Sequence, residues 1–242
     1  MPEEESDTRP STGGFGTSWC GTDLGEYREC RYTYELYSME SLPPLEPGRF
    51  AGDFRWYGDI GPALPERLKA LADLDEQLSA LGVALPGDFV TFQASANLHL
   101  SLDEVSVTAC WSHLSAPLAS PVEDGAFLVR FLRDQQDCVI WYLYLRPSQD
   151  AFVVHSFIDY ESEYEAQDYG EQTRSDLQDP DQQRAALQWC ASSFEEFAYR
   201  NWIENRLWHA VHQNPRPALP PDEAEYLRHY APIGDRAQVW NP

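Results

Sequence analysis

Lysine is almost absent from this chain of 242 residues: Lys69 is the only one, and 16 arginines supply the rest of the positive charge. Asp and Glu together number 40, so the formal net charge is −23. Proteins that bind nucleic-acid phosphates need a basic surface, and no local cluster of arginines in the sequence provides one. The scarcity of positive charge therefore argues against DNA or RNA as a partner.

Long apolar runs are also missing. A membrane-spanning helix needs about 18 or more uninterrupted apolar residues, whereas the most apolar run, Cys138 to Leu145, is only as long as a strand. The N-terminal residues Met1 to Pro10 are acidic and polar, without the basic and apolar regions of a secretion signal. We therefore expect no membrane partner and a cytoplasmic location.

Cysteine is scarce, and its spacing indicates neither a disulfide framework nor a zinc site. The five cysteines include no C-x-x-C pair, and an odd number cannot all pair within one chain. Buried reduced thiols are the simpler interpretation. The sequence also lacks the spacings of phosphate-binding loops, nucleophile elbows and metalloprotease helices, so we predict no enzyme activity, no catalytic residues and no cofactor.

Two histidines leave an enzymatic alternative open. His209 and His212 are three residues apart on a predicted helix and can face one metal ion, although metal-binding helices usually add an acid at matching spacing. Histidines at a helix C-terminus also complement the helix dipole, which is the simpler reading. A metal-dependent hydrolase is therefore kept only as a second alternative.

Three regions differ in composition. Residues 1–18 are acidic and rich in Ser, Thr and Gly, which predicts a disordered tail. Residues 19–61 are rich in aromatic side chains, including Trp56 and Tyr57, and are interrupted by prolines, so we expect a loop-rich layer packed on the core. Residues 62–242 carry the helix and strand patterns of a folded domain.

The pattern of this third region predicts an α+β domain. Leucines at three- and four-residue steps predict a helix from about 62 to 82, and a short helix follows at 85–92. Four β-branched or aromatic runs joined by short links predict an antiparallel, mainly meander sheet of about 4–6 strands with flanking helices. The run over 139–145 is apolar on both alternating faces, which predicts a central strand. The four runs are 105–111, 126–133, 138–145 and 151–157, and a further strand is expected over 31–39.

One more long helix is predicted from about Ser193 to His212, with a shorter one at 222–229. Ser192 or Ser193 can begin it, because each is followed three residues later by a glutamate in the capping-box pattern. Its apolar residues surround nearly the whole helix, so it must be covered on more than one side. We expect the sheet to cover one side and the aromatic layer the other.

An acidic insert at 159–181 is the most charged part of the chain. It carries nine acidic residues and one arginine, a net charge of −8. A solvated loop and a divalent-cation site from Asp176, Asp179 and Asp181 are two interpretations of such a run. A protein-binding surface is the third, because tyrosines alternate with the acids, and aromatic anchors among complementary charges are typical of specific interfaces. The candidate contact residues are Asp159, Tyr160, Glu161, Glu163, Tyr164, Glu165, Asp168, Tyr169 and Glu171, with Trp56 and Tyr57 of the aromatic layer as a second set.

Four motifs in a fixed order resemble the SMI1/KNR4 superfamily, also called the SUKH group. They are LPGDFVTF at 85–92, CVIWYLYL at 138–145, AFVVH at 151–155 and SFEEF at 193–197. The resemblance covers about residues 62–212, and it departs from the usual pattern at 93–97, where QASAN replaces a glycine-bearing turn. It implies an α+β fold without catalytic residues and a role in binding other proteins.

Bacterial members of this superfamily are commonly immunity proteins that neutralise toxins, and fungal relatives are regulatory scaffolds. The resemblance therefore implies an immunity protein, with a regulatory or scaffold protein of the same fold as the alternative. Nuclease toxins are basic because they bind phosphates, so an acidic protein is steered electrostatically onto them. The expected partner is a basic toxin domain.

Overall fold

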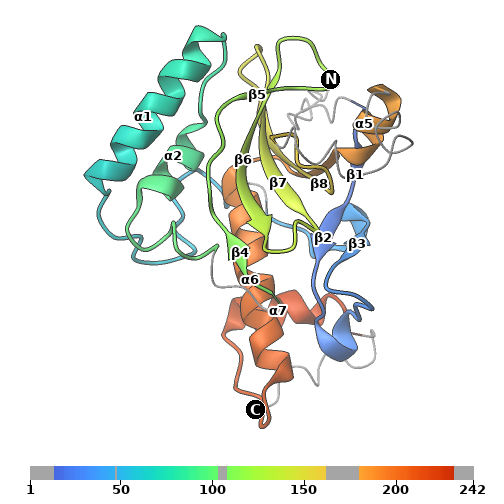
Figure 1. Cartoon of the computed structure of the whole chain (residues 1–242). Helices are drawn as coiled ribbons and strands as arrows, with labels where there is room; N and C mark the ends of the chain where they lie inside the picture. Colours follow the sequence, from blue (N-terminus) through green and yellow to red (C-terminus); the bar gives the residue numbers. More distant parts are fainter. Residues whose placement is uncertain (1–13, 47, 103–107, 162–179, 232–242) are drawn as a thin grey trace, which may run out of the picture.

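The computed structural model describes residues 14–46, 48–102, 108–161 and 180–231. Its centre is a seven-stranded mixed sheet in the order β1-β9-β8-β7-β6-β4, with β5 also paired to β6, and a separate two-stranded sheet joins β2 to β3. Helices flank the large sheet, which gives the α+β architecture that the sequence predicts (Figure 1). The strands are β1 (Gly16–Thr17), β2 (Trp19–Gly21), β3 (Glu35–Tyr37), β4 (Cys110–Trp111), β5 (Leu118–Ala119), β6 (Phe127–Asp134), β7 (Ile140–Leu145), β8 (Ala151–Ser156) and β9 (Gln188–Ala191). The helices are η1 (Gly25–Tyr27), η2 (Met39–Ser41), α1 (Pro65–Ala80), α2 (Gly87–Ala94), α5 (Pro180–Ala186), α6 (Phe194–His212) and α7 (Pro221–Arg228).

An antiparallel run from β6 to β9 forms the middle of the large sheet. All six residues of β7 are buried between β6 and β8, which confirms the prediction of a central strand covered on both faces. At one edge, however, β1 pairs with β9 in parallel. The prediction of a wholly antiparallel sheet of about 4–6 strands is therefore wrong, since the sheet is mixed and has seven strands. The two-residue strands β1 and β5 leave no periodic pattern in a sequence.

The two faces of the sheet bury different sets of side chains. Trp141, Leu143 and Val153 face α2 and α6, whereas the outer face, which carries Tyr142 and Tyr144, packs under residues near β1 and α5. Alternation along β7 and β8 produces this division, since successive side chains of a strand point to opposite faces.

A bulge in β6 adds an aromatic ring to the α6 face. The register of β6 on β7 shifts between Arg130 and Leu132, which leaves Phe131 as the extra residue. The Phe131 ring lies 5.0 Å from that of Phe194 and 5.2 Å from that of Phe197. The bulge therefore directs one more side chain of β6 into the contact with α6.

Helix α6 begins at the second of the two predicted caps. The Ser193 hydroxyl accepts a hydrogen bond from the Glu196 N–H at 3.1 Å, and the Glu196 carboxylate accepts one from the Ser192 N–H at 3.2 Å. One side of α6 faces the sheet through Phe197, whose ring lies 6.2 Å from that of Trp141. The ring of Trp19, in the N-terminal layer, lies 5.8 Å from that of Phe197. This confirms that both the sheet and the layer cover the helix.

Helices α1 and α2 lie together at one side of the sheet (Figure 1). In α1 the predicted leucine stripe is buried only in its middle: Leu78 is fully buried, whereas Leu68 and Leu81 remain 41% and 45% exposed. In α2, Phe89 and Phe92 face the core as predicted, with their rings 4.8 Å and 5.0 Å from that of Phe194.

The N-terminal layer, residues 19–61, contains little regular structure. Of the strand predicted over 31–39, only β3 forms, and it pairs with β2. The remainder consists of the two short helices η1 and η2 and turns, with Leu24 and Phe54 buried at 0% exposure and Tyr32 exposed at 77%. Phe54 adopts a positive φ of 53°, which shows that the turn around it is held tightly.

The predicted tail is shorter than residues 1–18. Phe15 is 5% exposed, its ring lies 5.1 Å from that of Tyr144, and Gly16–Thr17 forms β1. The tail prediction is therefore wrong for residues 15–18, and residues 1–13 lie outside the described part of the chain. Strand β9 and helix α5 were not predicted either. Among the described residues, no helix is long and apolar enough to cross a membrane.

Candidate functional site

The first residues of the predicted acidic surface are engaged inside the fold. Arg130, on the outer face of β6, is buried and lies 3.2 Å from the Asp159 carboxylate, which is buried as well. The same guanidinium pairs with Glu161 and donates to the His113 Nδ1 at 3.2 Å. Asp159 is therefore not an accessible contact residue, because it is buried and its charge is matched by Arg130 of β6.

Tyr160 also packs against the core. Its ring lies 5.6 Å from that of Tyr142, and its N–H donates to the Tyr142 hydroxyl at 3.2 Å. The other predicted residues of the insert lie outside the described part of the chain, so the contact surface proposed for them stays a prediction. They are Glu163, Tyr164, Glu165, Asp168, Tyr169 and Glu171, together with two of the three acids of the alternative cation site, Asp176 and Asp179.

The second predicted set, Trp56 and Tyr57, lies where the N-terminal layer meets α6. The Trp56 ring is 5.2 Å from the rings of both Tyr199 and Trp202, and the Tyr57 ring is 6.1 Å from that of Trp202. Trp56, Tyr57 and Trp202 are all partly exposed. The sequence predicted two of these aromatic residues, and the fold adds Trp202 and Tyr199.

A buried carboxylate on α6 fixes this turn of the layer. Glu195 is 0% exposed and accepts hydrogen bonds from the Gly52 N–H at 2.5 Å, the Phe54 N–H at 2.7 Å and the Trp56 Nε1 at 3.1 Å. Burial raises the pKa of Glu195, and the two backbone donors oppose that rise. Three donors from one short segment therefore orient the Trp56 side chain on the helix.

A second buried carboxylate, Glu204, lies nine residues farther along α6, about two and a half turns on, and also holds the layer. Arg28 donates to Glu204 through two nitrogens at 2.7 Å and 2.6 Å, and Trp19 Nε1 donates at 2.9 Å. The Tyr226 hydroxyl of α7 donates to it at 2.7 Å. Burial alone would raise the pKa of Glu204, but the Arg28 guanidinium and the other donors outweigh it and lower this pKa. The layer, α6 and α7 thus share one buried charge.

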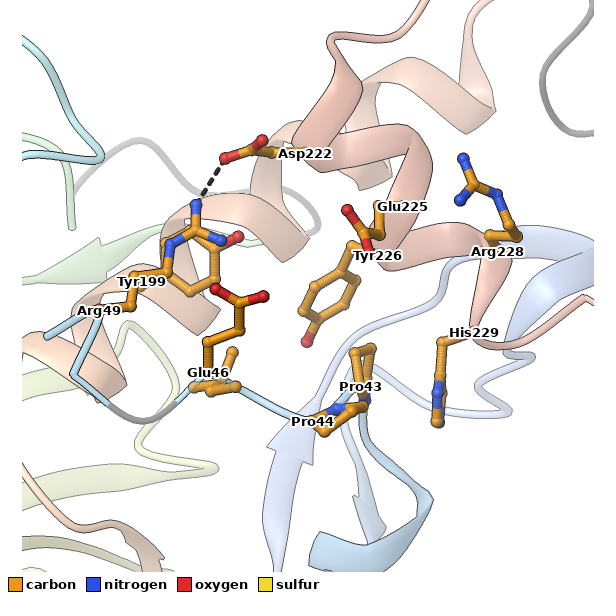
Figure 2. A pocket seen from close by; sticks show the side chains of 11 residues that line it. Pro43, Pro44, Glu46, Arg49, Tyr199, Asp222, Glu225, Tyr226, Arg228 and His229 are labelled. Carbon is orange, nitrogen blue, oxygen red and sulfur yellow. Dashed lines mark hydrogen bonds and ion pairs between the residues drawn. The ribbon is translucent and has the colours of Figure 1, made fainter.

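A pocket of about 270 Å³ opens between the layer and α7, beside these anchors (Figure 2). Pro43, Pro44 and Leu45 line one side, and Tyr199 and Tyr226, which are only 3% and 4% exposed, lie at its base. Its charged or titratable lining residues are Glu46, Arg49, Asp222, Glu225, Arg228 and His229. Tyr199 lines the pocket and also contacts Trp56, so it lies between the pocket and the aromatic group. We call Trp56, Tyr57 and Trp202, together with this pocket, the junction surface.

The positive groups of the pocket already have partners. Arg49 pairs with Asp222 at 2.5 Å, its guanidinium lies 4.6 Å from the centre of the Tyr199 ring, and Figure 2 shows it turned toward Asp222. His229 donates a hydrogen bond from Nε2 to the Ser41 carbonyl oxygen, 3.1 Å away, and Arg228 has an interaction of its own. Glu46 and Glu225 differ, because their carboxylates form no hydrogen bond or ion pair within the described residues.

His209 and His212, at the end of α6, are not part of a metal-binding group among the described residues. His212 Nε2 lies 3.0 Å from Asp23, its Nδ1 lies 2.8 Å from the Trp208 carbonyl oxygen, and its ring stacks on Trp208. Within residues 14–46, 48–102, 108–161 and 180–231, no three His, Cys, Asp or Glu side chains are grouped so that they could hold a metal ion. His212 is thus accounted for by contacts that join α6 to the layer.

Comparison with known proteins gives no assignment. No protein-family model matches the chain, and neither the curated proteins nor the solved structures contain a significant match to it. Function must therefore be inferred from the junction surface and the chemistry of its residues.

Proposed function

We propose that this chain is a non-enzymatic protein-binding module of the SMI1/KNR4 type, and specifically an immunity protein that neutralises a basic toxin domain. Its resemblance motifs support the proposal because they meet in one core. The LPGDFVTF motif forms α2, the two strand motifs form β7 and β8, and SFEEF opens α6. Phe89, Phe194 and Trp141, from three of these motifs, belong to a single hydrophobic cluster.

The junction surface is the observation that carries the proposal. Protein interfaces place aromatic side chains at their centre and charged groups at the rim, and Trp and Tyr often supply most of the binding energy. Trp56, Tyr57 and Trp202 are half-buried rings that contact one another. The pocket beside them carries two carboxylates, of Glu46 and Glu225, that have no partner among the described residues. A rigid aromatic group next to negative charge is suited to a basic protein partner.

Neutralisation by this surface needs binding alone. A chain with a net charge of −23 attracts a basic protein over distances set by the ionic strength, which increases the association rate. Once docked, the aromatic residues exclude water around the charged contacts and slow dissociation. A toxin whose active cleft is basic would be blocked without any reaction at the surface.

Co-expression tests this function directly. We expect the product of the adjacent gene to be toxic when expressed alone, to be tolerated when expressed with this protein, and to co-purify with it. Replacing both Tyr57 and Trp202 by Ala should abolish protection and weaken binding at least about 100-fold, as expected when two aromatic hot-spot residues are lost. The control is Leu68→Ala, which removes an exposed apolar side chain of α1 that is not part of the junction surface.

The outcomes separate the immunity function from its alternatives. Binding to a neighbouring gene product without protection would favour a regulatory or scaffold protein of the same fold. Equal protection by the double variant and the wild type would remove the junction surface from the proposal. If no basic toxin domain binds and no neighbour is neutralised, the immunity function is wrong.

A further inference from the structure

We propose that the pocket of the junction surface receives the side chain of one arginine of the partner protein. This inference rests on the proposed binding function and names the group on the partner that the pocket recognises. It rests on the pocket's size, on the chemistry of its walls, and on which of its charged groups are already engaged.

The size of the pocket fits one side chain. Sites for drug-sized ligands usually occupy about 300–1,000 Å³, and this pocket has a volume of about 270 Å³. Its walls combine Pro43, Pro44 and Leu45 with the rings of Tyr199 and Tyr226. An arginine has an apolar stem and a charged planar head, so it matches a pocket with apolar walls and carboxylates at its opening.

The unpaired charges select a cation. Figure 2 shows the Glu46 and Glu225 side chains on opposite sides of the pocket, each directed into the space between the layer and α7. An anion would need the arginines or His229 instead, and Arg49 is held by Asp222 while His229 lies at the Ser41 carbonyl oxygen. The groups that are left to bind a ligand are therefore negative.

The chain itself shows how a guanidinium fits against this wall. Arg49 places its guanidinium 4.6 Å from the centre of the Tyr199 ring and 2.5 Å from an Asp222 oxygen. An arginine on an aromatic face with a carboxylate at its edge is a favourable arrangement of cation–π and ion-pair contacts. Tyr226 is only 4% exposed, so an arginine from outside would meet mainly the Glu46 and Glu225 carboxylates, with Pro44 and Leu45 against its apolar stem.

The test uses N-acetyl-arginine amide as the probe and follows amide and side-chain NMR signals of the full chain. We expect saturable shifts at residues 43–49 and in α7, with a dissociation constant on the order of 1–10 mM for so small a ligand. N-acetyl-citrulline amide has the same shape without the charge and should produce no saturable shift. Glu46→Gln with Glu225→Gln should weaken binding of the arginine probe at least about fivefold.

A matched charge change provides the control. Glu66→Gln with Glu76→Gln removes two exposed carboxylates of α1 and should leave the probe's affinity unchanged. Equal shifts with the citrulline probe, or equal weakening in the control variant, would overturn the arginine site. Saturable binding of the arginine probe in a protein that captures no toxin would support the pocket and contradict the immunity function, so the two proposals fail separately.

Discussion

The ion pairs of two buried arginines, Arg28 and Arg130, differ between the N-terminal layer and the start of the acidic insert. Arg28 of the layer meets Glu204 through two hydrogen bonds at 2.7 Å and 2.6 Å, and two further donors, from Trp19 and Tyr226, complete the same carboxylate. Arg130 meets Asp159 at 3.2 Å and 3.4 Å and shares its charge with Glu161, whose side chain is 37% exposed.

This difference indicates that the N-terminal layer is a permanent part of the fold, whereas Arg130 and Asp159 hold only the first residues of the acidic insert. Glu204 of α6 depends on donors from the layer and from α7, so the layer cannot leave without exposing a buried charge. Arg130 has three partners within reach, and losing one of them does not leave it unpaired. We conclude that the layer is part of the core and that its exposed rings form a rigid binding surface.

Removing the Glu204 charge should have the largest effect on stability. Glu204→Ala leaves the Arg28 guanidinium buried without its carboxylate, and breaking a buried pair in this way costs about 3–5 kcal/mol. Urea denaturation measures the change in the free energy of unfolding. The double variant Arg28→Met with Glu204→Met should be less destabilised than Glu204→Ala, because it removes both charges. A cost below about 1 kcal/mol for Glu204→Ala would show that the layer is not held by this pair.

Acid should destabilise the fold at the contact between His155 of β8 and Ser18. His155 is fully buried beside Ser18, and burial lowers its pKa from 6.5 to about 4. Below about pH 6.5 the unfolded chain takes up a proton that the folded chain refuses until about pH 4, so the unfolding free energy falls with decreasing pH. The total loss is about 3 kcal/mol, at about 1.4 kcal/mol per pH unit.

Urea denaturation at several pH values checks the His155 prediction. His155→Gln should flatten the slope of unfolding free energy against pH between pH 6.5 and pH 4, whatever its own stability. His99→Gln, which changes a partly exposed histidine, should leave the slope as in the wild type. An unchanged slope in His155→Gln would mean that this histidine is protonated normally in the fold.

Asp159→Asn should cost less than the loss of Glu204. Arg130 retains Glu161 and His113, so we expect about 1–2 kcal/mol from the lost charge and its hydrogen bonds. The double variant Asp159→Asn with Glu161→Gln should cost more than the sum of the single changes, because only then is the guanidinium left without an acid. Strict additivity in urea denaturation would contradict the shared-charge interpretation of Arg130.

Charges in the rest of the insert should have the smallest effect. Replacing Glu163, Glu165 and Glu171 by Gln leaves the junction surface intact, so we expect the association rate with a basic partner to fall about two- to fivefold with little change in dissociation. Stopped-flow association at low and high salt measures this, and the difference from the wild type should shrink as salt rises. A loss of binding at high salt would place the contact surface in the insert instead.

Long periodic elements could be predicted from the sequence, and short or nonlocal ones could not. The leucine steps of α1, the phenylalanines of α2 and the doubly apolar run of β7 gave clear patterns. Strand β1 has two residues, and its parallel partner β9 is about 170 positions away in the chain, so no local signal marks the pairing. The tail was predicted too long for the same reason, since only tertiary contacts bury Phe15.

The candidate site was predictable only in part. Trp56 and Tyr57 were identified because aromatic residues are unusually dense in the layer, but nothing local connects them to Trp202 or to α7. Asp159 was predicted as a contact residue because it begins an acidic run, whereas its partner Arg130 lies on a strand 29 residues earlier. The charge of the insert follows from its number of acidic residues. That Asp159 is buried and paired could be learned only from the structure.

The central claim is that the junction surface binds a basic partner, and binding of the adjacent gene's product tests it most directly. Isothermal titration calorimetry would compare the wild type, Tyr57→Ala with Trp202→Ala, and the insert variant with Glu163, Glu165 and Glu171 changed to Gln. We predict at least about a 100-fold loss of affinity for the junction variant and at most about fivefold for the insert variant. Wild-type affinity in the junction variant, with binding lost in the insert variant, would contradict the account.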